Sequence, residues 1–128
     1  MIQINTNLNV IDNSGAKIAY CIGLGFGFKK KFASTGDIIV VSIKNLRNKR
    51  KLSSKVLKGD ILHALIVRTK FVKFNKLSGD SFYFKENAVV LLTRQNKFLF
   101  TRIFGVIPNY FRYSKYLRIL SMSSGNLN

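Results

Sequence analysis

The sequence predicts a mainly β protein that folds as one small barrel. Its apolar runs are short and rich in Val and Ile, and Gly, Asn and Ser bound them. This pattern is typical of strands joined by tight turns. Several short strands at such spacing favour a small barrel. No linker divides the 128 residues, so the chain 1–128 is predicted to be a single domain.

The first half of the chain holds the best strand candidates. Residues 8–12 (LNVID) and 16–24 (AKIAYCIGL) are predicted to form a hairpin around the turn DNSG. Residues 36–46 (GDIIVVSIKNL) and 59–69 (GDILHALIVRT) are the two strongest strands, and each begins with Gly-Asp. Asp is favoured in turns because its side chain bonds nearby backbone N–H groups. We expect four of the five acids to be turn residues of this kind: Asp12, Asp37, Asp60 and Asp80.

The second half adds a ribbon, one more strand and a helical tail. Residues 72–84 alternate around Ser78-Gly79-Asp80, which predicts a β-ribbon. Residues 87–93 (NAVVLLT) predict a further strand. The single proline, Pro108, opens the tail. One or two short helices are expected there, with the better case at 115–122.

The titratable residues do not have the pattern of a catalytic or metal site. An acid–base pair needs two converging carboxylates, whereas the few acids here lie in separate turns. With one histidine (His63) and one cysteine (Cys21), the sequence cannot build a zinc site. The stretch GLGFGFKKKF (23–32) lacks the spacing of a phosphate-binding loop, and no helix start follows it. Its glycines are interpreted as a barrel strand end, and we expect no enzyme, metal or cofactor.

The charge predicts a polyanionic partner. The chain carries 22 Lys+Arg against 5 Asp+Glu, a net charge of +17. A polyanion relieves the resulting self-repulsion and releases counterions. Nucleic acid is favoured over a membrane, because no apolar run approaches the roughly 20 residues of a spanning helix. The aromatic residues among the basic clusters could stack on unpaired bases or belong to the core: Phe28, Phe32, Phe71, Phe74 and Phe98.

Several segments together are similar to one known family. They are MIQ at the start, LNVIDNSGAK (8–17), GDI (36–38), KVLKGDILHALIVRTK (55–70), NAVVLL (87–92) and TRIFG (101–105). In this order and spacing they resemble the universal large-subunit ribosomal proteins of the L-fourteen family. The resemblance covers nearly the whole chain. It implies a closed five-stranded β-barrel, a projecting β-ribbon, a short helical C-terminal region and no catalysis.

The resemblance also implies partners. Family members bind large-subunit rRNA, lie beside neighbouring large-subunit ribosomal proteins and help form bridges to small-subunit rRNA. The basic loop 44–58 looks like the family's bridge-facing segment. The cations assigned to rRNA contact are Lys17, Lys29, Lys30, Lys31, Arg47, Lys49, Arg50, Lys51, Lys55, Lys58, Arg68, Lys70, Lys73 and Arg94. The residues assigned to protein docking, where family members bind a ribosome-silencing factor, are Thr101, Arg102, Lys115, Arg118 and Ser121.

The chain departs from the family pattern at a few positions. Phe100 replaces the usual Gly before TRIFG, and Val106 replaces the usual Pro after it. Lys85-Glu86 stands where the family has Asp-Gly, so we expect that turn to be rebuilt.

The composition points to a compartment. Phe, Ile, Asn and Lys are abundant and Trp is absent, as AT-rich codons would produce. The family start is intact at Met1, with no import sequence before it. Together these features favour a protein encoded and used in a mitochondrion, with a plastid as the alternative. A free nucleic-acid-binding barrel acting outside the ribosome is the alternative function.

Overall fold

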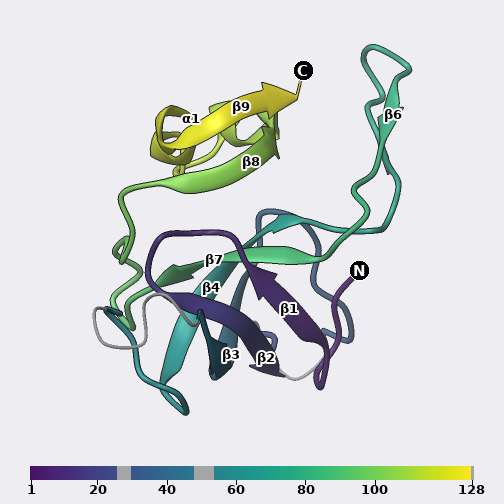
Figure 1. The fold of residues 1–128 in the computed structure, drawn as a ribbon. Coiled ribbons are helices and arrows are strands. Elements are labelled where there is room, and N and C mark those ends of the chain that lie inside the picture. The colour runs from purple at the N-terminus through teal and green to yellow at the C-terminus, as the bar shows by residue number, and fades with distance from the viewer. Residues whose placement is uncertain (26–29, 48–53, 128) are drawn as a thin grey trace.

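The computed structural model describes residues 1–25, 30–47 and 54–127. Within them, five strands close into a barrel in the order β1-β2-β3-β4-β7 (Figure 1). These strands are β1 (Asn7–Val10), β2 (Ala16–Gly23), β3 (Ile38–Leu46), β4 (Ile61–Arg68) and β7 (Ala88–Leu92). All neighbours are antiparallel except β1 and β7, which close the barrel in parallel. The predicted mainly β fold with a closed barrel is confirmed.

Two further units extend from the barrel. The ribbon consists of β5 (Lys73–Phe74) and β6 (Ser81–Phe82), which pair antiparallel and project away from the barrel (Figure 1). The C-terminal unit consists of β8 (Ile103–Pro108), the 3-10 helix η2 (Asn109–Tyr113), α1 (Arg118–Met122) and β9 (Ser123–Leu127). Both units occur where the sequence predicts a ribbon and a short helical tail.

The C-terminal unit also holds two strands that the sequence pattern did not predict. β8 and β9 pair in parallel, with Val106 opposite Gly125 and Ile107 opposite Asn126. The β9 segment SSGNL lacks the β-branched and aromatic residues that favour strands. It is held by partners distant in the sequence, such as the Gly105 carbonyl oxygen, which accepts a hydrogen bond of 3.0 Å from Ser124 Oγ. Local sequence reasoning therefore had no signal for this strand.

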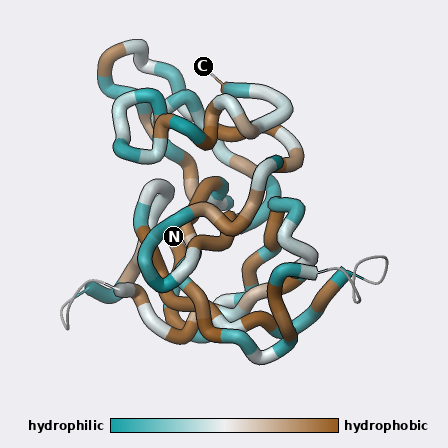
Figure 2. The backbone as a smooth tube through the Cα atoms, turned by 90° about the vertical axis from the view of Figure 1, so that its left-hand side faces the viewer, coloured by the Kyte–Doolittle hydropathy of each residue, from teal (hydrophilic) through white to brown (hydrophobic). Residues whose placement is uncertain are grey.

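Two hydrophobic cores explain the different strand patterns. β1 and most of β3 alternate between buried and less buried residues, because only one face packs into the barrel. All five residues of β7 are buried. Val89 and Leu91 face the barrel core, whereas Val90 and Leu92 belong to a second core with Phe111 and the C-terminal unit. In Figure 2, the hydrophobic stretches of the chain are concentrated in the barrel.

The GLGFG stretch begins at the end of a barrel strand, as predicted. Gly23 ends β2, next to a register shift against β3. Gly25 has φ +74°, and a Cβ there would lie 2.8 Å from the Ile38 carbonyl oxygen. Glycine therefore permits this close approach of two backbones. Gly27, Phe28 and Lys29 lie outside the described residues.

Three of the four acids predicted to hold turns through their side chains do so: Asp12, Asp37 and Asp60. The Asp60 carboxylate accepts the Leu57 N–H at 2.8 Å. Asp12 is buried and accepts the N–H groups of Ser14 and Leu91 at 3.0 and 2.8 Å, together with the Ser14 hydroxyl. Burial raises the pKa of Asp12, and these hydrogen bonds oppose that rise. The Asp12 carboxylate thus joins the first hairpin turn to β7.

Asp37 tests how much a turn carboxylate contributes to the stability of the fold. Burial disfavours its ionised form, but hydrogen bonds from Lys30 Nζ at 2.7 Å and Ser34 N–H at 2.9 Å hold its pKa below the ordinary value of 3.8. A lowered folded-state pKa contributes stability above the ordinary pKa, and this is lost as pH falls through the folded value. We expect Asp37→Asn to lower the Tm at pH 7 and the difference from wild type to shrink as the pH falls towards 2, as followed by circular dichroism.

The matched control is Asp80→Asn. Asp80 is exposed in the ribbon turn, and no hydrogen bond to its carboxylate is recorded in the described part of the chain. Its substitution should leave the Tm nearly unchanged at both pH values. If the Tm of Asp37→Asn lies below that of wild type by the same amount at pH 7 and at pH 2, the carboxylate charge does not contribute to stability.

Candidate nucleic-acid interface

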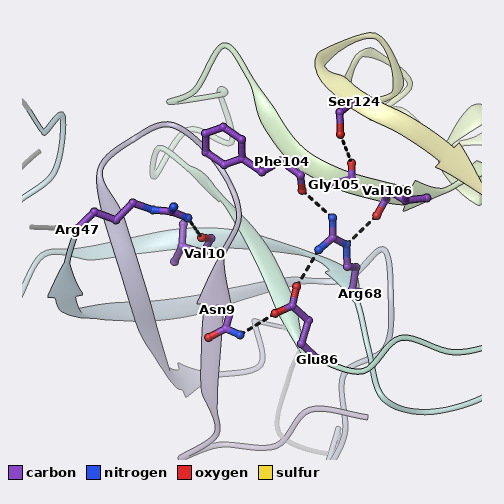
Figure 3. A network of polar contacts seen from close by, with 9 residues as sticks. All are labelled: Asn9, Val10, Arg47, Arg68, Glu86, Phe104, Gly105, Val106 and Ser124. Atoms are coloured by element: carbon purple, nitrogen blue, oxygen red, sulfur yellow. Dashed lines mark hydrogen bonds and ion pairs between the residues drawn. The ribbon is translucent and has the colours of Figure 1, made fainter. Parts of the chain in front are cut away.

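Arg68, one of the cations assigned to rRNA, lies inside the fold. It ends β4 and is only 8% exposed. Its guanidinium donates to the carbonyl oxygens of Phe104 at 2.6 Å and Val106 at 2.7 Å, and pairs with Glu86 Oε1 at 2.8 Å (Figure 3). Glu86 Oε2 in turn accepts from Asn9 Nδ2 at 2.8 Å. We therefore remove Arg68 from the predicted RNA-contact set, because its donors link the barrel to the C-terminal unit.

Glu86 lies in the turn that departs from the family pattern. Its carboxylate balances the buried guanidinium, whose burial without partners would cost several kcal/mol. Gly105 has φ +82°, and a Cβ there would overlap the guanidinium of Arg68. Arg68, Glu86 and Gly105 are far apart in the sequence, but they meet in one contact.

Three other assigned cations converge on one hollow. Lys17 is exposed on β2, Arg47 follows β3, and Lys58 is exposed before β4. All three line an open hollow of about 1040 Å³ bounded by β1, the first hairpin turn and Phe104. Arg47 is anchored there by the carbonyl oxygens of Val10 at 2.9 Å and Ala16 at 3.3 Å. We call this hollow the basic groove.

A second basic group lies at the base of the ribbon. Lys30 pairs with Asp37, and Lys73 donates to the Thr35 carbonyl oxygen at 3.3 Å and lies 4.4 Å from the centre of the Tyr110 ring. Burial lowers the pKa of Lys73, and the charge of Asp37 opposes that shift. Lys73 thus helps to attach the ribbon to the C-terminal unit.

The remaining assigned cations divide into two groups. Lys31, Lys55, Lys70 and Arg94 are exposed. Lys55 Nζ donates to the Leu99 carbonyl oxygen at 3.2 Å, which leaves two of its N–H groups for other acceptors. Lys29, Lys49, Arg50 and Lys51 lie outside the described residues.

The protein-docking residues are partly brought together. Thr101, Arg118 and Ser121 line a shallow hollow of about 450 Å³ with Phe98 and Phe100. The hollow joins the start of β8 to α1. Arg102 and Lys115 are exposed but do not line it. The family departure at Phe100 thus supplies part of its floor, since that ring is 3% exposed and packs against Phe98.

Two residues that line the groove, Phe104 and Asn45, were not predicted from the sequence. Phe104 lies within the TRIFG motif, but its ring is 37% exposed, and its outward position depends on the Arg68 contact. Asn45 is exposed near the end of β3. The sequence signal for this position is the glycine that follows Phe104, because Gly105 permits the positive φ of the backbone there.

Other kinds of site find no support in the described residues. Across 1–25, 30–47 and 54–127, no group of three or more His, Cys, Asp or Glu side chains is placed to hold a metal ion. No helix in these ranges has the length and apolar content needed to cross a membrane.

The fold and its surface define a class: small, strongly basic β-barrel proteins. The family model described as ribosomal protein L14p/L23e matches residues 1–127. The chain therefore belongs to this family of structural proteins of the large ribosomal subunit. The resemblance noted in the sequence is confirmed at the level of the family. Ribosomal RNA and ribosomal proteins are the kinds of partner that membership implies.

Gly105 tests the contact between the barrel and the C-terminal unit. We expect Gly105→Ala to lower the free energy of unfolding by about 2–5 kcal/mol, because it adds backbone strain and displaces the charged hydrogen bonds of Arg68. Urea denaturation of the full chain measures the change.

Gly79→Ala is the matched control, since Gly79 has φ +76° with open space around the added methyl group. It should show only the backbone strain, about 1 kcal/mol. Equal losses in the two variants would mean that the displaced Arg68 contacts contribute nothing measurable.

Proposed function

We propose that this protein binds large-subunit rRNA through its exposed cations and helps to join the two ribosomal subunits. The observation that carries the proposal is the basic groove, where Lys17, Arg47 and Lys58 converge from three separate parts of the chain. Such convergence positions cations to neutralise neighbouring phosphates. Lys31, Lys70 and Arg94 provide further exposed cations outside the groove.

The proposal includes the subunit interface. The loop 44–58 bears the densest basic run of the chain, with Lys49, Arg50 and Lys51 at its centre. We assign it to a bridge with small-subunit rRNA. The hollow lined by Thr101, Arg118 and Ser121 is assigned to a neighbouring ribosomal protein or a ribosome-silencing factor.

The proposed compartment is the mitochondrion, with a plastid as the alternative. The support is the composition, with abundant Phe, Ile, Asn and Lys and no Trp. Immunogold labelling of the cells that make the protein would distinguish the two organelles.

Salt dependence tests the RNA contact. If about 6–10 phosphates are neutralised, affinity for large-subunit rRNA should fall about 10³–10⁵-fold between 50 and 200 mM salt. Lys58→Ala should reduce the slope of log affinity against log salt by about 1, whereas Lys58→Arg should keep it. The measurement is filter binding with purified chain and large-subunit rRNA.

Sedimentation separates the ribosomal function from that of a free nucleic-acid-binding barrel. Co-migration with large subunits in a sucrose gradient is the expected result. Protein found only in free fractions, and never with large subunits, would contradict the proposal.

The bridge assignment has its own test. Replacing Lys49, Arg50 and Lys51 together by Ala should reduce the yield of joined ribosomes more than the yield of large subunits, because the proposal assigns these charges to the bridge. Gradient profiles measure both yields. The control exchanges Lys and Arg at the same three positions, which preserves the charge. An unchanged yield of joined ribosomes in the alanine variant would refute the bridge.

A further inference from the structure

The basic groove combines its cations with an aromatic surface. Phe104, on β8, lines the groove with Lys17, Arg47 and Lys58, and its ring is 37% exposed. The volume of about 1040 Å³ is at the upper end of the roughly 300–1,000 Å³ of ordinary small-ligand sites. Cations alone suffice to hold a phosphate backbone. The exposed ring is therefore the feature that remains to be explained.

The backbone that carries the Phe104 ring is held by hydrogen bonds at both its N–H and its carbonyl group. The Phe104 N–H donates to the Ile11 carbonyl oxygen at 2.8 Å, and its carbonyl oxygen accepts from Arg68 Nη2 at 2.6 Å (Figure 3). These bonds tie β8 to the barrel next to the groove. The backbone that carries the ring is thus fixed before any ligand enters, which lowers the entropic cost of binding.

A planar cation lies over the ring. The Arg47 guanidinium carbon is 5.3 Å from the centre of the Phe104 ring, and the two carbonyl oxygens that anchor Arg47 fix its position. Aromatic and guanidinium planes are the surfaces on which unstacked RNA bases are bound. Asn45 adds an exposed amide to the lining, which can donate to or accept from a base edge.

The acidic residues of the groove offset Arg47 and Arg68, and they leave Lys17 and Lys58 unbalanced. Asp12 is buried and accepts hydrogen bonds from Ser14 and Leu91. Glu86 is paired with Arg68 and Asn9. Lys17 and Lys58 are exposed at the groove. An anionic occupant with a flat, apolar face matches these surfaces.

We propose that the basic groove holds one unpaired nucleotide of RNA, with its base against Phe104 and Arg47 and its flanking phosphates reached by Lys17 and Lys58. The inference rests on the proposed RNA-binding function and specifies the form of RNA that this site takes. A base within a duplex is covered by its neighbours on both faces, so double-stranded RNA would meet only the cations.

The test compares single-stranded and duplex RNA on the full chain. Fluorescence anisotropy would measure the affinity for a labelled uridine hexamer and for a labelled twelve-base-pair RNA duplex. We expect Phe104→Leu to weaken hexamer binding about tenfold, the scale of one lost base stack, and to leave duplex binding within about twofold. Phe104→Tyr keeps the ring and should bind the hexamer as wild type does.

The matched control is Tyr113→Leu. Tyr113 is 89% exposed on η2 and does not line the groove, so its loss should change neither affinity. Circular dichroism would confirm that Phe104→Leu retains the wild-type Tm. Should that variant unfold, wild-type protein and Phe104→Tyr still separate a stacking site from a purely cationic one. Only a stacking site would bind the uridine hexamer about tenfold more tightly than an abasic hexamer of the same charge.

Four results would overturn the inference. If Phe104→Leu binds the hexamer as Tyr113→Leu does, or loses hexamer and duplex affinity equally, the groove does not stack a base although the chain still binds RNA. If neither RNA binds in a salt-dependent way, the proposed function fails as well. If a hexaglutamate peptide displaces the hexamer from wild type and binds Phe104→Leu about tenfold more weakly, the groove accepts an acidic protein segment instead.

Discussion

The hydrogen bonds from Arg68 to the backbone of β8 are the interaction on which the placement of the C-terminal unit depends. A buried guanidinium is tolerated only when its donors are satisfied, and here two carbonyl oxygens and Glu86 provide the acceptors. Because Arg68 belongs to the barrel and the carbonyl oxygens belong to β8, satisfying the charge also orients the C-terminal unit. The second hydrophobic core can then close over the outer face of β4 and β7.

The chain uses its acids inside the fold and leaves most of its cations outside. Asp12, Asp37 and Glu86 each accept hydrogen bonds that join separate segments. Few negative charges therefore remain to balance the surface, and the net charge of +17 acts outward. A large apolar core offsets the resulting self-repulsion, and a polyanionic partner removes it. The excess of positive charge thus requires a stable barrel, and it also predicts a polyanionic partner for the protein.

The departures from the family pattern lie at structural contacts. Glu86 forms the ion pair with Arg68, so this turn contributes to the central contact of the fold. Phe100 fills the second core beside Phe98. Val106 pairs with Gly125 in the β8–β9 ladder, at a position where a proline would lack the backbone N–H that a ladder uses.

The sequence by itself determined the barrel strands, the turn acids, the ribbon and the cationic character. Each of these depends on local patterns: β-branched runs, Gly-Asp turns and charge composition. It could not determine the strand at 123–127, because SSGNL becomes a strand only by pairing with β8. Nor could it separate Arg68, which stabilises the fold, from Lys17 and Lys58, which line the basic groove. Arginine and lysine carry the same charge in the sequence, and only burial and the positions of distant carbonyl oxygens decide which cations are left to meet a phosphate.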